Sequence, residues 1–153
     1  TEAPFSCQEQ ISMYADRWIH LHQHATPEAM VDALRNSAFT IIGTVAPDEE
    51  GATPFAEITL PRKAAVLMGN EALGLSDELR NACDLFITIP AHGFTQSLNV
   101  SAAAAILLQH FGSAYRRQSG DAVLAPADQD RLVREWSERE VRSKLRQQTD
   151  HGT

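Results

Sequence analysis

The sequence predicts an α/β fold in which helices flank a parallel β-sheet. Short apolar segments recur along the chain, helical segments that begin at Ser or Thr separate them, and polar loops containing glycine follow two of the strands. The chain has 153 residues, of which 43% are hydrophobic and 7% aromatic. This is enough apolar material for a single core of ordinary size.

The first elements expected are a strand and a helix. Residues 18–21, with the sequence Trp-Ile-His-Leu, are a candidate strand. Thr26 and Pro27 then predict a helix start, because a hydroxyl N-cap precedes proline at the first helical position. We expect this helix to run to about Asn36.

Strands and helices alternate in the centre of the chain. Residues 39–45 and 64–68 are short and apolar, which is typical of strands buried on both faces of a parallel sheet. An acidic loop with proline and glycine lies between them. The later elements are a short helix capped by Ser76, a strand over 85–89 and an alanine-rich helix over 101–111. Ligands of such sheets bind at the carboxyl ends of the strands.

The last quarter of the chain differs in charge from the rest. The formal net charge is −7, yet eight of the 13 Lys and Arg residues lie in residues 112–153. The polar stretch over 116–121 indicates an exit from the core, so we divide the chain into a domain of residues 1–118 and a helical tail of residues 119–153. The tail helix, expected from about Pro126, is either a solvated helix or an RNA-facing one.

Composition excludes several classes of protein. An acidic total argues against a protein that coats nucleic acid with its whole surface, although a local basic patch stays compatible with it. Cys7 and Cys83 are too few for a disulfide scaffold and too far apart for a zinc knuckle. No apolar run approaches the roughly 20 residues that span a bilayer, and no signal-peptide pattern opens the chain. We therefore expect a cytoplasmic protein without a membrane partner.

A glycine loop follows the strand over 64–68. Gly69 and Gly74 bracket a turn in which missing Cβ atoms let the backbone approach a ligand. Their spacing resembles the start of a P-loop, but Leu75 and Ser76 replace the Lys-Ser/Thr pair, so a nucleoside triphosphate is not expected. Two interpretations stay open at this point, a ligand-binding loop and a plain strand-to-helix turn.

A second polar loop follows the strand over 85–89. It places more polar side chains before the alanine-rich helix than one N-cap requires: Thr95, Gln96, Ser97, Asn99 and Ser101. A ligand is the better explanation. The alternative, in which Ser97 or Asn99 merely caps the helix, leaves Gly93 and Gln96 unexplained.

These two loops resemble the signatures of the SPOUT superfamily, specifically the SpoU/TrmH family of RNA ribose 2'-O-methyltransferases. The matching segments are Gly-Asn-Glu-Ala-Leu-Gly-Leu-Ser and Ile-Pro followed by Gln-Ser-Leu-Asn-Val-Ser, in the family's order and each between a strand and a helix. The resemblance covers residues 12–118. It implies a C-terminal trefoil knot, S-adenosylmethionine as cofactor, a homodimer, and an RNA substrate. Weaker similarity in the tail favours tRNA over rRNA.

The resemblance also assigns site residues by their positions in the motifs. Ser97 and Asn99 would lie in the active centre and orient the target ribose, and Glu71 would be a hydrogen-bonded anchor between the loops or, alternatively, a solvent-facing acid. Nine residues would bind the cofactor: Thr44, Met68, Gly69, Asn70, Gly74, Ile89, Ser97, Leu98 and Asn99.

One motif of the family has no counterpart in this sequence. Methyl transfer to a ribose hydroxyl requires in-line positioning and removal of the hydroxyl proton. The family assigns the proton removal to an arginine in a segment of the form N-x-G-A-I-x-R, which is absent here. Since the chain begins at Thr1, we expect the first third of the family domain to be missing and methyl transfer by this chain to be weak. The alternative function is a non-catalytic dimeric module that binds the cofactor or RNA.

A metal site is not expected. His20, His22 and His24 alternate and would share one face of a strand, a spacing that can ligate zinc. No cysteine or acidic ligand is close in sequence, however, and the sulfonium of the cofactor already supplies the positive charge that transfer needs.

Overall fold

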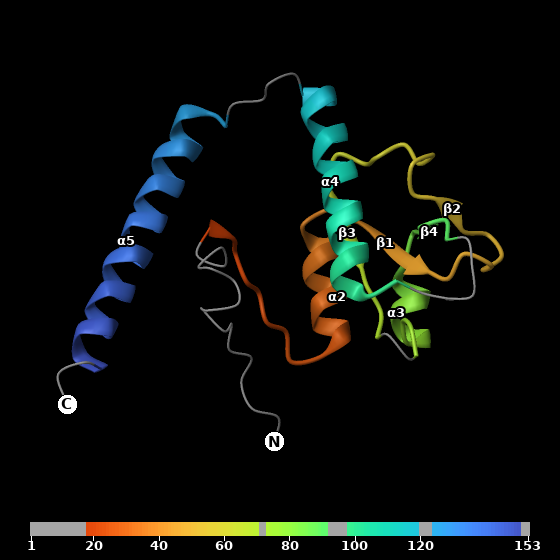
Figure 1. Ribbon diagram of the computed structural model, residues 1–153, viewed down its shortest axis with the longest axis horizontal. Helices are drawn as coiled ribbons and strands as arrows, with labels where there is room; N and C mark the ends of the chain where they lie inside the picture. Colours follow the sequence, from red (N-terminus) through yellow and green to blue (C-terminus); the bar gives the residue numbers. More distant parts are fainter. Residues whose placement is uncertain (1–17, 71–72, 92–97, 120–123, 151–153) are drawn as a thin grey trace. The chain divides into compact units, whose positions relative to one another are not determined.

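The computed structural model describes residues 18–70, 73–91, 98–119 and 124–150 (Figure 1). The chain divides into two compact units, one of residues His24–Ala122 and one of residues Thr1–Gln23 with Val123–Thr153. The predicted division after residue 118 stays a prediction. Among the described residues, no helix is both long enough and apolar enough to cross a membrane.

The larger unit contains a four-stranded parallel sheet, as the sequence predicts. The strands are β1 (Thr40–Val45), β2 (Thr53–Pro54), β3 (Ala64–Leu67) and β4 (Leu85–Thr88), in the order β2-β4-β1-β3. β1 is central and pairs with β3 on one side and β4 on the other. The carboxyl ends of these three strands therefore meet at one edge of the sheet.

Helices cover both faces of this sheet. Alternation along β1 turns Ile42 toward one face, where it packs with Ile87, Leu107 and Phe111. Ile41 turns toward the other face and packs with residues of α2 and α3. Ile41, Ile42 and Ile87 are fully buried, so the core lies on both sides of the two central strands.

Helix starts follow the predicted caps. α2 (Pro27–Asn36) begins after Thr26, whose Oγ1 accepts a hydrogen bond from the Ala29 amide at 3.3 Å. α3 (Asp77–Ala82) begins after Ser76 in the same way, with its Oγ 3.4 Å from the Leu79 amide. α4 (Val100–Ser119) is longer than expected. Two arginines in its last turn suit the negative end of a helix, which explains why the polar stretch continues the helix.

The smaller unit corrects the prediction for residues 18–21. These residues form no strand, because no described strand pairs with them. They lie instead along α5 (Pro126–Asp150), where Trp18 meets Trp136 edge to face with ring centroids 5.3 Å apart. The premise that three histidines share one strand face is therefore wrong.

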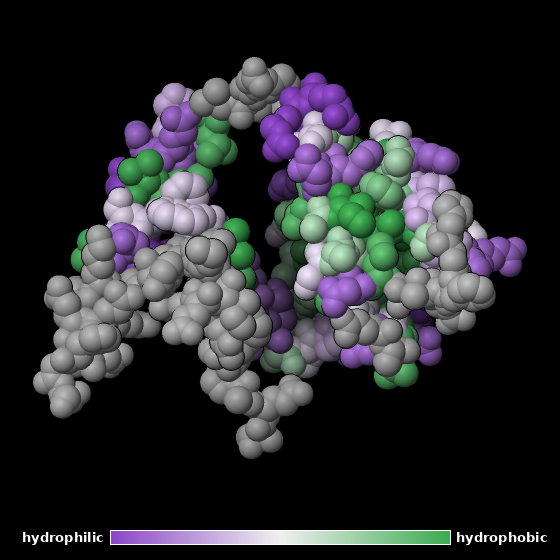
Figure 2. Space-filling model, in the orientation of Figure 1, coloured by the Kyte–Doolittle hydropathy of each residue, from purple (hydrophilic) through white to green (hydrophobic). Residues whose placement is uncertain are grey.

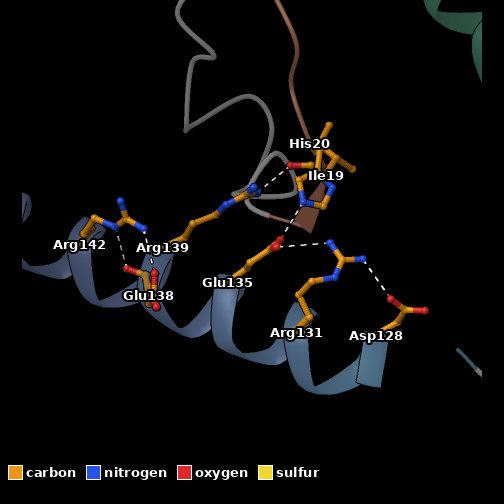
Figure 3. A network of polar contacts seen from close by, with 8 residues as sticks. All are labelled: Ile19, His20, Asp128, Arg131, Glu135, Glu138, Arg139 and Arg142. Carbon is orange, nitrogen blue, oxygen red and sulfur yellow. Dashed lines mark hydrogen bonds and ion pairs between the residues drawn. The ribbon is translucent and has the colours of Figure 1, made fainter. Parts of the chain in front are cut away.

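Polar contacts hold the same segment against α5 (Figure 3). His20 Nε2 lies 2.9 Å from Glu135 Oε2, and Arg139 Nη1 donates to the Ile19 carbonyl oxygen at 2.8 Å. The hydrogen bond from His20, followed by the charge of Arg131, holds the pKa of Glu135 below its usual value. Ion pairs extend this network along α5 from Glu135 to Arg131 and Asp128, and Glu138 and Arg142 form a separate pair on the same helix.

Candidate cofactor pocket at the strand ends

A pocket of about 360 Å³ opens at the carboxyl ends of β1, β3 and β4. Its volume lies within the range of about 300–1,000 Å³ that is common for small-molecule sites. The lining takes the last two residues of β1 and part of the loop after it, both described ends of the loop after β3, and Ile89, Ala91 and Leu98 after β4, followed by the first turn of α4. The lining residues are Thr44, Val45, Ala46, Pro47, Glu49, Met68, Gly69, Asn70, Leu73, Gly74, Leu75, Arg80, Ile89, Ala91, Leu98, Val100 and Ala103.

The loop after β3 is closed on itself by backbone hydrogen bonds. The Asn70 amide donates to the Gly74 carbonyl oxygen at 2.9 Å, and the Gly74 amide donates back to Asn70 at 2.8 Å. The Asn70 side chain also accepts from the Leu73 amide, 3.3 Å away. These bonds hold the described ends of the loop, at Asn70 and at Leu73 and Gly74, together in the lining of the pocket.

Both glycines of this loop are required by its geometry. A Cβ on Gly69 would lie 2.2 Å from the Gly74 carbonyl carbon and 2.4 Å from the Leu75 nitrogen, which are backbone atoms that cannot move aside alone. Gly74 has a φ of +68°, in the left-handed region that other residues rarely adopt. The two interpretations of this loop are thus compatible, since the tight turn is also the wall of a pocket.

The ends of β1 and β3 are tied together beneath the pocket. Thr44 Oγ1 donates a hydrogen bond to the Leu67 carbonyl oxygen at 3.0 Å. This bond joins the threonine side chain of β1 to the neighbouring strand, and contact of Thr44 with the cofactor stays a prediction.

The segment after β4 enters the pocket through Leu98. The next residue, Asn99, caps α4: its Oδ1 accepts from the Ser101 amide at 2.9 Å and from the Ala102 amide at 3.4 Å. The capping role that the sequence left open is therefore present in the structure. A role for Asn99 in catalysis stays a prediction, and Ser97 and Glu71 lie outside the described residues.

The pocket brings together seven of the nine residues expected to bind the cofactor. They are Thr44, Met68, Gly69, Asn70, Gly74, Ile89 and Leu98. The eighth, Asn99, lies next to the lining, directly before α4. The ninth, Ser97, lies outside the described residues.

Sequence reasoning missed the charged part of the wall. Glu49, in the loop after β1, forms an ion pair through Oε1 with Nη2 of Arg80 on α3. The Arg80 guanidinium also lies over the ring of Phe86, 5.3 Å from its centroid. The sequence did contain a signal for Glu49, because the acidic loop that holds it directly follows β1, a third strand that ends at the same edge of the sheet. Arg80 gave no local signal, since tertiary packing alone brings it there.

Cys83, the cysteine within the described part of the chain, has a thiol that is not activated. Burial, and next the charge of Asp84, raises the pKa of Cys83 above its usual value. Its Sγ lies 3.1 Å from the Leu79 carbonyl oxygen. A thiol held in its neutral form is a poor nucleophile, so Cys83 acts as a packing residue.

Three comparisons identify relatives of this chain. A tRNA (guanosine(18)-2'-O)-methyltransferase of Borreliella burgdorferi is 30% identical over 122 residues, which make up 80% of this chain and 55% of that protein. The crystal structure of the A. aeolicus TrmH/SpoU tRNA modifying enzyme matches with a TM-score of 0.77 at 26% identity, over 90% of this chain and 70% of that one. The SpoU methyltransferase AviRb of Streptomyces viridochromogenes, in complex with the cofactor AdoMet, matches with a TM-score of 0.50 at 31% identity, over 62% and 38% of the two chains.

This chain spans about half the length of its Borreliella relative. The model of the SpoU rRNA Methylase family matches residues 5–109, a range that contains all three strand ends, the loop with Gly69 and Gly74, and Asn99 before α4. Since this match extends over more than half of the sequence, the chain belongs to the SpoU rRNA Methylase family.

Proposed function

We propose that this chain is the cofactor-binding part of an S-adenosylmethionine-dependent RNA ribose 2'-O-methyltransferase. The observation that carries the proposal is the pocket at three parallel strand ends, with Gly69 and Gly74 in its lining. A family relative, AviRb, is known in complex with AdoMet.

The described residues fit such a cofactor. Gly74 has no Cβ and has open space beside it, so a flat adenine can lie directly against its main chain. Aliphatic side chains of Ile89, Leu98 and Val100 also line the pocket and offer apolar contacts to the cofactor. The cofactor, when bound, supplies a methyl group on a positively charged sulfur. The chain's own residues bind and orient it.

The proposed substrate is a ribose 2'-hydroxyl of tRNA, with rRNA as the second candidate. Support for tRNA comes from the Borreliella methyltransferase and from the A. aeolicus tRNA modifying enzyme, both of which match most of this chain. We propose that the modification takes place in the cytoplasm, where tRNA and rRNA are available. Asn99 would then serve two purposes, as the cap of α4 and as a group near the target ribose.

We also propose that the chain forms a homodimer whose C-terminal fold is a trefoil knot. The family resemblance supports both features. The described surface adds an argument for the dimer, because hydrophobic residues gather over and beside α4 in Figure 2. Leu108 of α4 is 74% exposed and Leu73, at the pocket, is 87% exposed. Light scattering at micromolar concentration should give twice the mass of one chain, and the mass of a single chain would contradict the dimer.

Calorimetric titration with S-adenosylhomocysteine tests the cofactor site. We expect saturable binding by the unmodified chain and at least about tenfold weaker binding by Gly74→Val, because valine is strained at a φ of +68°. Arg142→Met is the matched control, since Arg142 lies on the exposed surface of α5. Saturable binding without methyl transfer to unmodified tRNA would identify the non-catalytic module, and equal binding by Gly74→Val would contradict the site.

A further inference from the structure

The pocket wall contains two charged side chains among its described residues, and they face each other. Glu49 and Arg80 come from different elements, the loop after β1 and helix α3. Their side chains are 36% and 32% exposed, so the pair is about two-thirds covered and is held more firmly than an ordinary surface pair.

Local structure fixes both partners. The Glu49 amide donates to the Ala46 carbonyl oxygen at 3.2 Å, and the Ala52 amide donates to the Glu49 carbonyl oxygen at 3.3 Å, so Glu49 lies where two consecutive turns meet. Arg80 rests on the ring of Phe86, which belongs to β4. The carboxylate is thus held at the pocket by a guanidinium that is itself held by the sheet.

Among the lining side chains that the structure describes, Glu49 is the one that carries a negative charge. The Thr44 hydroxyl already donates to Leu67, and the Asn70 side-chain oxygen already accepts from Leu73. Among the described residues, Arg80 is the side chain seen to bind Glu49, and it takes Oε1. Oε2 therefore keeps its lone pairs for a ligand.

The proposed cofactor has a matching pair of donors. Its adenosyl group carries a ribose with two adjacent hydroxyls, and burying them without acceptors is costly. A carboxylate that accepts from a ribose hydroxyl is a recurring solution in nucleotide sites. We propose that Glu49 binds the ribose diol of the adenosyl group, and that Arg80 is a positioning residue that acts through Glu49. This inference rests on the proposed cofactor site.

Calorimetry with matched nucleosides tests the assignment. Adenosine and 2',3'-dideoxyadenosine differ only in the diol, and S-adenosylhomocysteine carries the diol without the positive sulfur. We expect Glu49→Gln to weaken the binding of S-adenosylhomocysteine and of adenosine by about tenfold to a hundredfold, the range for a lost hydrogen bond to a charged group. Binding of 2',3'-dideoxyadenosine should be weak and unchanged by the substitution.

Arg80 is tested through its dependence on Glu49. Arg80→Met keeps an apolar chain against Phe86 and removes the charge. It should weaken the binding of S-adenosylhomocysteine when Glu49 is present and have no further effect on binding in the Glu49→Gln variant. Glu138→Gln is the control for a glutamate paired with arginine outside the pocket.

The outcomes separate the possible readings. An equal loss of binding affinity for adenosine and its dideoxy analogue in Glu49→Gln would overturn the diol assignment. A loss of affinity for S-adenosylmethionine alone would also overturn it and would point to a contact between Glu49 and the sulfonium. Unchanged binding in Glu49→Gln, with binding by the unmodified chain intact, would overturn this inference and leave the proposed function standing. Absence of binding by the unmodified chain would overturn both. Thermal melts of each variant distinguish lost binding from lost folding.

Discussion

Replacing Gly69 by alanine tests whether contact between main-chain segments builds the pocket. The new Cβ would lie 2.2 Å from the Gly74 carbonyl carbon and 2.6 Å from its oxygen, so the loop must open. Opening it breaks the two hydrogen bonds between Asn70 and Gly74, which contribute about 1–3 kcal/mol together. Overpacking adds about 1–3 kcal/mol. The free energy of unfolding should therefore fall by about 2–6 kcal/mol.

Two glycine variants serve as controls for this measurement. Gly112→Ala places its Cβ no closer than 3.7 Å to the flexible Arg116 side chain, within α4, and should stabilise by about 0.5–1 kcal/mol. Gly74→Ala meets open space but keeps a φ of +68°, which costs about 1–2 kcal/mol.

The assay combines thermal melts with calorimetric binding of S-adenosylhomocysteine. One kcal/mol corresponds to about 4–8 °C for a domain of roughly 100 residues, so Gly69→Ala should melt at least about 8 °C below the unmodified chain. It should also melt below Gly74→Ala and bind at least about tenfold more weakly than Gly112→Ala. A Gly69→Ala variant that has the same melting temperature as Gly112→Ala, or that binds S-adenosylhomocysteine with the same affinity, would refute the steric reasoning.

Three further changes test other parts of the structure. Asn99→Ala should destabilise α4 by about 0.5–2 kcal/mol, whereas Asn99→Ser keeps a capping oxygen. A loss of cofactor binding in both variants would indicate that Asn99 does more than cap the helix, and normal binding in both would contradict such a role. Asp84→Ala removes the carboxylate that accepts from the Ile41 amide at 2.7 Å, and urea melts should show a loss of about 1.5–3 kcal/mol; an unchanged midpoint would contradict this. Because the pKa of Glu135 is lowered in the folded protein, its contact with His20 is favoured above the usual value of 4.5 and is lost as the pH falls through the lower folded value. The fluorescence of the chain's two tryptophans, which meet at this contact, should change over that acid range in the unmodified chain but less in Glu135→Gln, and equal changes would contradict the link.

The central strands and helix starts were predictable because local and tertiary preferences agree there. Residues around Ile41 and Ile42 are apolar on both faces, and the structure buries both. Thr26 and Ser76 cap helices that the sequence marks by the same residues. β2 was not predicted, because two residues that end in a proline carry no strand pattern, and their pairing with β4 defines them.

The errors arise where a distant partner decides the local structure. Trp18 and Leu21 suit a strand, but a strand requires a pairing edge, and Trp18 contacts Trp136 of α5 instead. The same limit explains the site. Gly69 and Gly74 were visible as a motif, whereas Arg80 reaches the pocket only because α3 packs beside the loop after β1.

Amide chemical shifts recorded during titration with S-adenosylhomocysteine test the cofactor site most directly. At 16.8 kDa the chain is suited to residue-resolved spectra. We predict saturable shifts for the amides of the three strand ends, with Gly69, Gly74 and Leu98 among the largest, and no shifts in residues 126–142 of α5. Saturable shifts centred on α5, or none at the strand ends, would contradict a cofactor site in this pocket.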